Sequence, residues 1–355
     1  MKNLTIKSNF FNYKVNFLQT NSFSKTLKKE LRKSDVIILD KNVYKIYKKY
    51  FGKSIFKHLV IIDAAEKHKS FQYLNSIYKD LLRKNVTRKS RLIAIGGGII
   101  QDIVCFISST LFRGIEWIFF PTTLLAQADS CIGSKSSINF EQYKNLIGTY
   151  YPPSKIYIDD FFLNSLSLNE IRSGVGEIIK VYLIVRSNEI TDLNQIIINE
   201  FKDLNQLKKH IYQSLKIKKL IIEEDEFDQR KRKILNYGHS FGHAIETATN
   251  YKIPHGVAVT IGMNIANYIS KEIGNISDTR YQFYQKILSN NANHFFRYKI
   301  NYKKIIEALK KDKKNINSKI FNLILWKNNK NLGVLSIPNN QTFSKYLKKY
   351  FNQNK

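Results

Sequence analysis

The chain of 355 residues is poor in acidic side chains, with 28 Asp and Glu against 58 Lys and Arg. The resulting net charge of +30 is a feature of many nucleic-acid-binding proteins. The lysines, however, are scattered over nearly every segment among abundant Ile, Asn, Phe and Tyr, a composition typical of AT-rich genomes, and we recognise no nucleic-acid-binding motif. We therefore expect a solvated basic surface or attraction to an anionic substrate, and no nucleic-acid partner.

Cysteines and long apolar runs are also scarce. Cys105 and Cys131 are the two cysteines, which argues against a disulfide framework and fits a reducing compartment. The longest apolar stretch is interrupted by Glu116 and Pro121 and is too short to span a bilayer. Residues 1–17 mix Lys, Asn and Ser with apolar residues and do not resemble a signal peptide. These absences predict a cytoplasmic protein that does not associate with membranes.

Short apolar runs alternate with helical patterns in the first part of the chain. The runs that read as strands are at 36–40, 59–63, 91–95, 117–120 and 156–159. Helical patterns lie between them at 43–51, 69–84 and 99–110. Such alternation predicts a parallel sheet covered by helices on both faces. The length of the chain favours two domains rather than one core.

Helical patterns dominate after the break at Pro152 and Pro153. They are at 170–185, 204–224, 234–250, 257–272 and 302–311. We expect a Rossmann-like α/β nucleotide-binding domain at 1–160 and a mostly α-helical domain, binding metal and substrate, at 161–355. The tail from Asn339 is polar and rich in lysine, which favours a frayed end.

Three of the seven histidines, His239, His243 and His255, lie within one short segment. His239 and His243 are four residues apart and would share one face of a helix. His255 follows a short loop marked by Pro254. Because imidazole is the commonest protein ligand for a divalent transition metal, the cluster indicates a metal site. The alternative is a set of ordinary polar residues on a helix.

Four further features point to chemistry, each with a plainer alternative. The glycines at 96–98 lie at a strand-to-helix junction, where backbone N–H groups can approach a phosphate, although a tight turn needs small residues too. The polar segment 121–135 follows a strand, at the edge where α/β sheets bind ligands, or it is a surface loop. Glu177 and Lys180 would share a face of an apolar helix, or form a surface ion pair. Asp40 could bind a ribose hydroxyl or cap a helix.

Taken in order, these segments resemble the 3-dehydroquinate synthase family over about residues 40–314. The matching blocks are GGGIIQD at 96–102, FRGI at 112–115, PTTLLAQADSCIGSK at 121–135, YKNLIGTYYPP at 143–153, GVGEIIK at 174–180, LNYGHSFGHAIE at 235–246, HGVAVTIGM at 255–263 and DKK at 312–314. The resemblance implies an enzyme of the shikimate pathway that converts 3-deoxy-D-arabino-heptulosonate 7-phosphate to 3-dehydroquinate and phosphate. It also implies NAD as a catalytic cofactor and one divalent metal, zinc or cobalt.

The implied chemistry is oxidation of a ring hydroxyl, elimination of phosphate, re-reduction, ring opening and an internal aldol closure. The metal would polarise the oxygen that is oxidised, and hydride transfer belongs to the cofactor. The rival hypotheses are another sugar phosphate cyclase, a metal-dependent polyol dehydrogenase, and a basic protein that binds RNA or membrane surfaces with a decayed site. A dehydrogenase would release NADH, whereas a cyclase returns its hydride within one turnover.

The resemblance also implies a role for individual residues. The metal ligands would be Glu177, His239 and His255, in place of the His239/His243 pair, and His243 would assist proton transfer. The residues implied to contact substrate are Asp129, Lys135, Asn145, Lys180, Lys218, Arg232, Asn236 and one of Lys313 and Lys314, with Arg113 supplied across a homodimer interface to the substrate phosphate. The residues implied to bind NAD are Asp40, Asn42, Glu66, Lys69, Gly97, Gly98, Ile99, Asp102, Thr122, Thr123, Lys135, Lys144, Phe162, Leu163, Asn164 and Ser165.

The chain departs from the family pattern at four positions. Gln101 stands where the family has glycine beside the pyrophosphate, and it would be strained if the backbone there had a positive φ. Ser134 replaces the second glycine before the substrate lysine. Val257 replaces a glutamate beside the third metal ligand, which could loosen the surroundings of the metal. Asp228 replaces a longer glutamate. We expect an active enzyme of lower efficiency.

Overall fold

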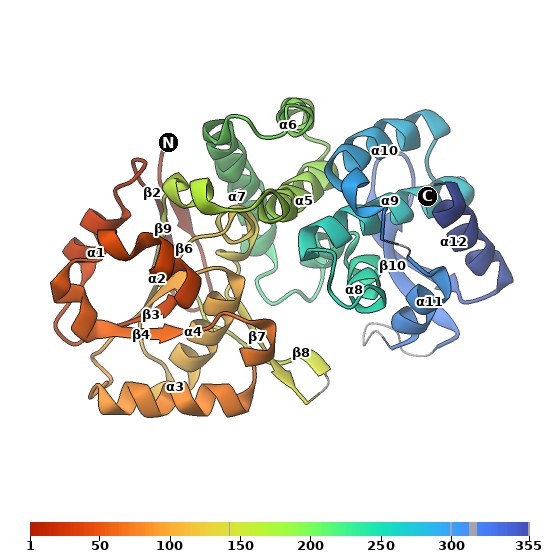
Figure 1. Ribbon diagram of the computed structural model, residues 1–355. Coiled ribbons are helices and arrows are strands. Elements are labelled where there is room, and N and C mark those ends of the chain that lie inside the picture. The colour runs from red at the N-terminus through yellow and green to blue at the C-terminus, as the bar shows by residue number, and fades with distance from the viewer. Residues whose placement is uncertain (142, 299, 312–317, 354–355) are drawn as a thin grey trace. The chain divides into compact units, whose positions relative to one another are not determined.

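The computed structural model describes residues 1–141, 143–298, 300–311 and 318–353 (Figure 1). The contacts divide the chain into two compact units. The first contains Met1–Ser167 with Ile211–Phe227, and the second contains Leu168–His210 with Asp228–Lys355. These units are groups of residues in contact, whereas the boundary expected near residue 160 separates domains that fold independently. That boundary stays a prediction. Among the described residues, no helix combines the length and hydropathy that a membrane crossing requires.

A seven-stranded sheet forms the centre of the first unit, in the order β1-β2-β9-β6-β5-β3-β4. The strands are β1 Leu4–Ile6, β2 Tyr13–Phe17, β3 Val36–Asp40, β4 Leu59–Ile62, β5 Leu92–Gly96, β6 Trp117–Pro121 and β9 Lys155–Ile158. From β2 to β4 all neighbouring pairs are parallel, which confirms the predicted sheet. The edge pair β1–β2 is antiparallel and was missed, because a strand of three residues carries too little periodicity to be recognised.

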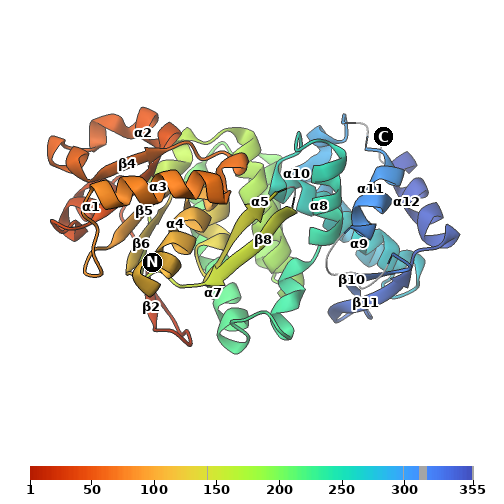
Figure 2. The same cartoon turned by 90° about the horizontal axis from the view of Figure 1, so that it is seen from below.

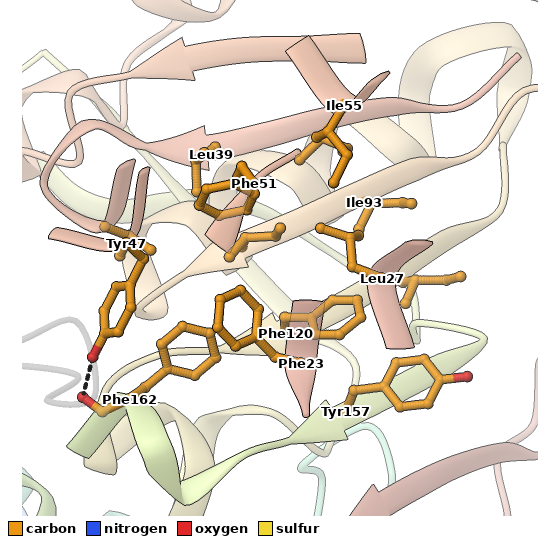
Figure 3. Close-up of a cluster of buried hydrophobic side chains, with 14 residues drawn as sticks. Phe23, Leu27, Leu39, Tyr47, Phe51, Ile55, Ile93, Phe120, Tyr157 and Phe162 are labelled. Carbon is orange, nitrogen blue, oxygen red and sulfur yellow. Dashed lines mark hydrogen bonds between the residues drawn. The ribbon is translucent and has the colours of Figure 1, made fainter. Parts of the chain in front are cut away.

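Helices cover both faces of this sheet, as predicted. On one face, α1 (Phe23–Glu30) and α2 (Lys41–Tyr47) pack their apolar residues on alternate residues of the strands. Figure 3 shows this cluster, in which the rings of Phe23, Phe120 and Phe162 lie close together and the Tyr47 hydroxyl donates to the Phe162 carbonyl at 3.4 Å. On the other face, α4 (Gly98–Thr110) packs against β5 and β6, with α3 (Phe71–Arg83) beside it.

A separate hairpin, β7 (Lys135–Phe140) and β8 (Tyr143–Tyr150), packs on α4. Figure 2 shows β8 along its length. The segment 121–135, interpreted above as one polar loop, instead contains a π-helical turn at Ala126–Ser130 and ends by entering β7. The first unit also includes most of α7 (Leu207–Glu224).

The second unit is mostly helical. Its helices are α5 Leu168–Val185, α6 Glu189–Ile198, α8 His239–Ala248, α9 His255–Glu272, α10 Asp278–Ala292, α11 Tyr302–Lys310 and α12 Gln341–Gln353, with a hairpin of β10 Ile320–Trp326 and β11 Leu332–Pro338. Helix α9 is buried over most of its length and packs against α5, α8 and α10 (Figures 1 and 2).

Two expectations for the second unit were wrong. The helix predicted over 234–250 begins at His239, because Gly238 has φ +78° and separates it from a 3₁₀ turn at Lys231–Asn236. The described part of the tail, residues 339–353, is not frayed. It forms α12, an amphipathic helix that buries Phe343, Leu347 and Tyr350 between exposed lysines.

Candidate metal centre and cofactor-binding residues

Helices α5 and α9 approach each other so closely that only glycine fits at their contact. A Cβ atom at Gly256 would lie 1.8 Å from the carbonyl oxygen of Ser173, and one at Gly176 would lie 2.1 Å from the carbonyl oxygen of Gly256. Glu177 and His255 are the sequence neighbours of these two glycines. The helix contact therefore brings a carboxylate from one helix to an imidazole at the start of the other.

Glu177, His239 and His255 converge at this contact. The Oε1 atom of Glu177 lies 3.4 Å from Nε2 of His255 and 3.8 Å from Nε2 of His239, and the three ligand atoms all lie within 4.8 Å of one another. For an ion about 2.0–2.1 Å from each ligand, two atoms of a tetrahedral set lie roughly 3.4 Å apart. The spacing and the one-carboxylate, two-imidazole donor set fit a catalytic divalent metal.

The other ring nitrogen of each histidine faces an oxygen. Nδ1 of His255 lies 3.3 Å from Oε1 of Glu246, and Nδ1 of His239 lies 3.3 Å from the carbonyl oxygen of Tyr237. Such contacts select the tautomer with the proton on Nδ1 and direct Nε2 towards the ligand position. Glu246 supplies the carboxylate that Val257 cannot. Sequence reasoning missed Glu246, although its spacing of three from His243 in the GHAIE segment was a usable signal.

A lysine holds the second oxygen of Glu177. Nζ of Lys180 lies 2.5 Å from Oε2, and both side chains are almost fully buried. Burial raises the pKa of Glu177, but the charges of Lys180 and His255 outweigh it and lower that pKa far below its usual range. Burial lowers the pKa of His255, while hydrogen bonds to Glu177 and Glu246 raise it to about 10. Without a cation, the cluster is therefore held together as ion pairs, and a bound metal would displace the imidazolium proton.

His243 lies one helical turn after His239 and is exposed. Its ring centroid is 5.6 Å from that of His239 and 5.7 Å from that of His255. His243, Glu246 and His255 also bring three possible ligand atoms within 4.8 Å of one another. The position beside the ligand set suits a group that moves a proton next to the metal.

In the first unit, Lys69 and four other predicted residues form one cluster. Nζ of Lys69 lies 2.6 Å from Oδ2 of Asp102, 2.8 Å from Oδ1 of Asn145 and 3.9 Å from Oε1 of Glu66. Nζ of Lys144 lies 3.8 Å from the same oxygen of Glu66. Burial raises the pKa of Asp102, opposed by the ammonium of Lys69. These contacts join the end of a 3₁₀ turn, helix α4 and the β7–β8 hairpin into one polar cluster.

Helix α4, which carries Asp102 of this cluster, begins at Gly97 and Gly98. A Cβ at Gly97 would lie 2.9 Å from Cγ2 of Thr123, whereas at Gly98 the nearest described atom is Oγ of Ser130 at 3.9 Å. Gln101 lies inside α4 with a helical backbone, so the strain considered above does not arise. Its side-chain amide donates to the Ser130 carbonyl at 2.6 Å and accepts from the Ser130 hydroxyl at 2.7 Å.

Several other predicted residues have defined surroundings. Nζ of Lys218 contacts Asp129 twice, at 2.8 Å from Oδ1 and 2.6 Å from the carbonyl oxygen. Lys135 is the first residue of β7 and its Nζ lies 5.9 Å from the ring centroid of Tyr150. In the second unit, Arg232 and Asn236 belong to the 3₁₀ turn that precedes α8.

Some predicted contacts have a different local role. Asp40 caps α2 by accepting a hydrogen bond from the backbone N–H of Asn42 at 2.7 Å. The side chains of Phe162 and Leu163 are buried in the core, which leaves their backbone as the part able to meet a cofactor. Arg113 is exposed in a turn after α4. Lys313 and Lys314 lie outside the described residues.

Comparison with known proteins finds family profiles over most of the chain. The family profile described as 3-dehydroquinate synthase N-terminal matches residues 59–173, and the C-terminal profile matches residues 174–315. The 3-dehydroquinate synthase of Helicobacter pylori is 39% identical over 297 residues, 82% of this chain and 84% of the relative. The 3-dehydroquinate synthase of Clostridium acetobutylicum is 35% identical over 325 residues, 88% and 89% of the two chains.

Solved structures share the fold at lower identity. The crystal structure of 2-deoxy-scyllo-inosose synthase complexed with carbaglucose-6-phosphate, NAD+ and Co2+ superposes with a TM-score of 0.87 at 23% identity, covering 98% of this chain and 100% of that one. The 2-epi-5-epi-valiolone synthase of Streptomyces hygroscopicus, with NAD+ and Zn2+ bound, gives a TM-score of 0.81 at 22% identity, covering 97% of both chains. The predicted fold, a parallel α/β part followed by a mostly helical part, is confirmed.

Proposed function

The chain belongs to the 3-dehydroquinate synthase family, and from this premise we propose that it converts 3-deoxy-D-arabino-heptulosonate 7-phosphate to 3-dehydroquinate and phosphate. The observation that carries the proposal is the convergence of Glu177, His239 and His255, with Nε2 of both histidines facing one carboxylate oxygen. We include in the same proposal a cytoplasmic location, because both cysteines are buried thiols without a disulfide partner.

The residues of the second unit fit a zinc or cobalt ion. When bound, such an ion polarises the substrate oxygen at which oxidation begins. Glu177, His239 and His255 would hold it, and three protein ligands leave a position for that oxygen. Lys180 keeps Glu177 ionised, Glu246 and Tyr237 orient the imidazoles, and His243 accepts or returns a proton beside them.

The residues of the first unit fit an anionic dinucleotide and a sugar phosphate. The start of α4 presents backbone N–H groups at Gly97 and Gly98, where a phosphate is stabilised by the helix dipole. Lys69, Asp102 and Lys144 form the polar cluster that we assign to NAD. Lys135, Asn145 and Lys218 supply donors and cations for the substrate, which carries a dianionic phosphate.

We propose a homodimer in which Arg113 reaches the substrate phosphate of the partner subunit. Phe112, Arg113 and Gly114 all have positive φ, at 53°, 67° and 123°. Three consecutive left-handed residues make a sharp turn that other packing must maintain, and strain of this kind gathers at functional sites. The turn leaves Arg113 exposed, as an arginine that serves another chain must be.

The decisive experiment gives purified protein the heptulosonate phosphate, NAD and zinc. We expect release of inorganic phosphate without net absorbance of NADH, and loss of that release in the presence of a chelator. Steady accumulation of NADH would instead indicate a polyol dehydrogenase. Phosphate release from another sugar phosphate, with none from the heptulosonate phosphate, would assign the chain to another cyclase reaction.

Two variants test the assigned residues. His255→Ala should lose bound zinc and turnover together, and unchanged zinc content would remove His255 from the ligand set. Arg113→Ala should bind the substrate weakly as a pure protein. Mixed with an inactive His255→Ala protein, it should recover part of its activity through hybrid dimers, and no recovery would indicate a site completed within one chain.

A further inference from the structure

Ser134, the residue before Lys135, has an unusual backbone conformation. Its φ of +65° lies in the left-handed region, which favours glycine. The side chain is buried, and its hydroxyl donates to Oε1 of Glu226 at 2.9 Å. The amide of Tyr151 donates to the carbonyl oxygen of Ser134 at 2.7 Å. A strained residue is thus held by a carboxylate on one side and by the backbone on the other.

Glu226 is a saturated acceptor. Oε1 also accepts from the hydroxyl of Ser8 at 2.7 Å, and Oε2 accepts from the backbone N–H of Asn9 at 2.7 Å and from its side-chain amide at 2.9 Å. Burial opposes ionisation, but the hydrogen bonds from Ser8, Asn9 and Ser134 outweigh it and lower the pKa of Glu226. The group is therefore a carboxylate at neutral pH, and bonds to a charged acceptor are stronger than neutral ones.

Phe227, the residue after Glu226, fixes the aromatic ring beside the ammonium group of Lys135. The carbonyl oxygen of Phe227 accepts from the hydroxyl of Tyr150 at 2.8 Å, and the two rings pack edge to face with centroids 5.2 Å apart. The ring of Tyr150 is the one that lies 5.9 Å from Nζ of Lys135. Glu226 and Phe227 thus fix both the backbone that precedes Lys135 and the aromatic ring next to its ammonium group.

We propose that Glu226 is a positioning residue for Lys135, because it maintains the left-handed turn at Ser134 from which β7 begins. The inference rests on the proposed function in one respect, namely that Lys135 binds the anionic substrate. Glu226 itself acts through Ser134. The bond from Ser134 to Glu226 compensates for the absence of a glycine at this left-handed position.

The test compares Glu226→Ala with Glu226→Gln. Alanine removes the acceptor, and we expect kcat/KM to fall roughly tenfold, mostly through KM, because a substrate contact displaced by a fraction of an ångström loses much of its value. Glutamine should restore most of the activity. Its carbonyl oxygen can serve Asn9, while its amide donates to the two serine hydroxyls, which accept as well as donate.

Glu223→Ala is the matched control. Glu223 lies three residues before Glu226, near the end of α7, and accepts from the backbone N–H of Lys7 at 2.6 Å. It therefore binds the same N-terminal segment, whereas the Ser134 hydroxyl donates to Glu226. Its loss should leave KM unchanged. A rise in KM as large as that of Glu226→Ala would reduce the effect to general anchoring of residues 7–9 and overturn the proposal.

A second mutation isolates the turn. Ser134→Gly adopts a positive φ without help, so Glu226→Ala in that background should change kcat/KM less than about threefold. Amide exchange of Tyr151, which donates to Ser134, should quicken at least tenfold in Glu226→Ala and return towards the native rate in the double variant. An equal loss of activity with and without Ser134→Gly, or unchanged exchange in Glu226→Ala, would refute the positioning role.

The exchange measurement needs no substrate, which keeps the two proposals apart. A native protein that releases no phosphate but shows the predicted exchange pattern would contradict the proposed function and leave the turn mechanism intact. Normal phosphate release by the native protein and by Glu226→Ala alike would support the proposed function and contradict the positioning role of Glu226.

Discussion

The candidate metal centre and the polar cluster around Lys69 each include a lysine in close contact with a carboxylate. These pairs are Lys180 with Glu177 and Lys69 with Asp102, and different interactions hold them in place. Glu177 and Lys180 lie on one helix, and the approach of α9 is set by backbone contacts at glycines. Lys69 and Asp102 lie on separate elements and contact each other directly at 2.6 Å, and Asn145 of the hairpin also accepts from Lys69. The candidate metal centre therefore depends on the spacing of helices, whereas the polar cluster around Lys69 depends on individual polar bonds.

The largest effect should come from Lys180→Met. It leaves the buried carboxylate of Glu177 with only the imidazolium of His255 to offset its charge, and breaking a buried pair in this way destabilises by about 3–5 kcal/mol. Chemical denaturation in the presence of a chelator should show this loss, and saturating zinc should reduce it because the cation replaces the ammonium charge.

Lys144→Met is the control for that measurement. Its pair with Glu66 is more than a third exposed on both sides, and such pairs change stability by about 0.5 kcal/mol or less. Equal losses in the two variants would mean that the charge of Glu177 is stabilised by something other than Lys180.

Helix spacing is tested by Gly256→Ala. The added methyl group meets the backbone of Ser173, which cannot rotate away, so we expect a loss of about 3 kcal/mol and markedly lower zinc content. Gly98→Ala, at the start of α4, meets no described atom closer than 3.9 Å and should keep its stability, since alanine is the better helix former. Normal zinc content in Gly256→Ala would show that α9 can shift without losing the ligand geometry.

We expect low pH to reduce the stability of the second unit because His210 is buried there. Its ring lies 2.8 Å from the hydroxyl of Tyr182 on α5, and burial lowers its pKa from 6.5 to about 4. Between these pH values the unfolded chain binds a proton that the folded chain does not, so stability is full above pH 6.5 and falls as the pH drops, by about 3 kcal/mol in total. Unfolding curves of His210→Gln should lack this loss, and curves that parallel the native protein would exclude His210 as its source.

The smallest effect we expect is that of Glu246→Ala. Removing the oxygen that orients His255 should weaken zinc binding 10- to 100-fold, as for other residues that orient metal ligands, with little change in fold. Competition with a chelating dye measures this directly. Glu272→Ala, at the other end of α9, is the control and should bind zinc like the native protein. Equal affinity in both variants would show that His255 is oriented without Glu246.

The fold was largely predictable where one element carries its own signal. The apolar runs of β3 and β5 mark buried parallel strands, and their predicted bounds agree with the structure to within a residue. The hairpin β7–β8 was missed because its residues are mostly polar or exposed, so no alternation marks it. The helix α12 was missed although it does have a periodic pattern. Four buried apolar residues lie along one face, but the many lysines between them made the segment look like a polar tail.

The site was less predictable from residue spacing. The rule for helix faces paired His239 with His243, but the structure directs Nε2 of His239 towards Glu177, which lies on another helix. Helix periodicity cannot report a contact between segments so distant in sequence. The family resemblance named that set of three, and it remains a proposal until zinc binding is measured. Neither approach indicated Glu226, because its role depends on the backbone angle at Ser134.

The turn at Phe112 and Arg113 has a practical consequence for anyone who wishes to make this protein more heat-tolerant. Each residue there occupies a conformation that costs an L-amino acid roughly 1–2 kcal/mol. Phe112 is exposed, and glycine or asparagine would relieve its share of that cost without changing a neighbour's side chain. Engineering should therefore begin at Phe112 and leave Arg113 as it is.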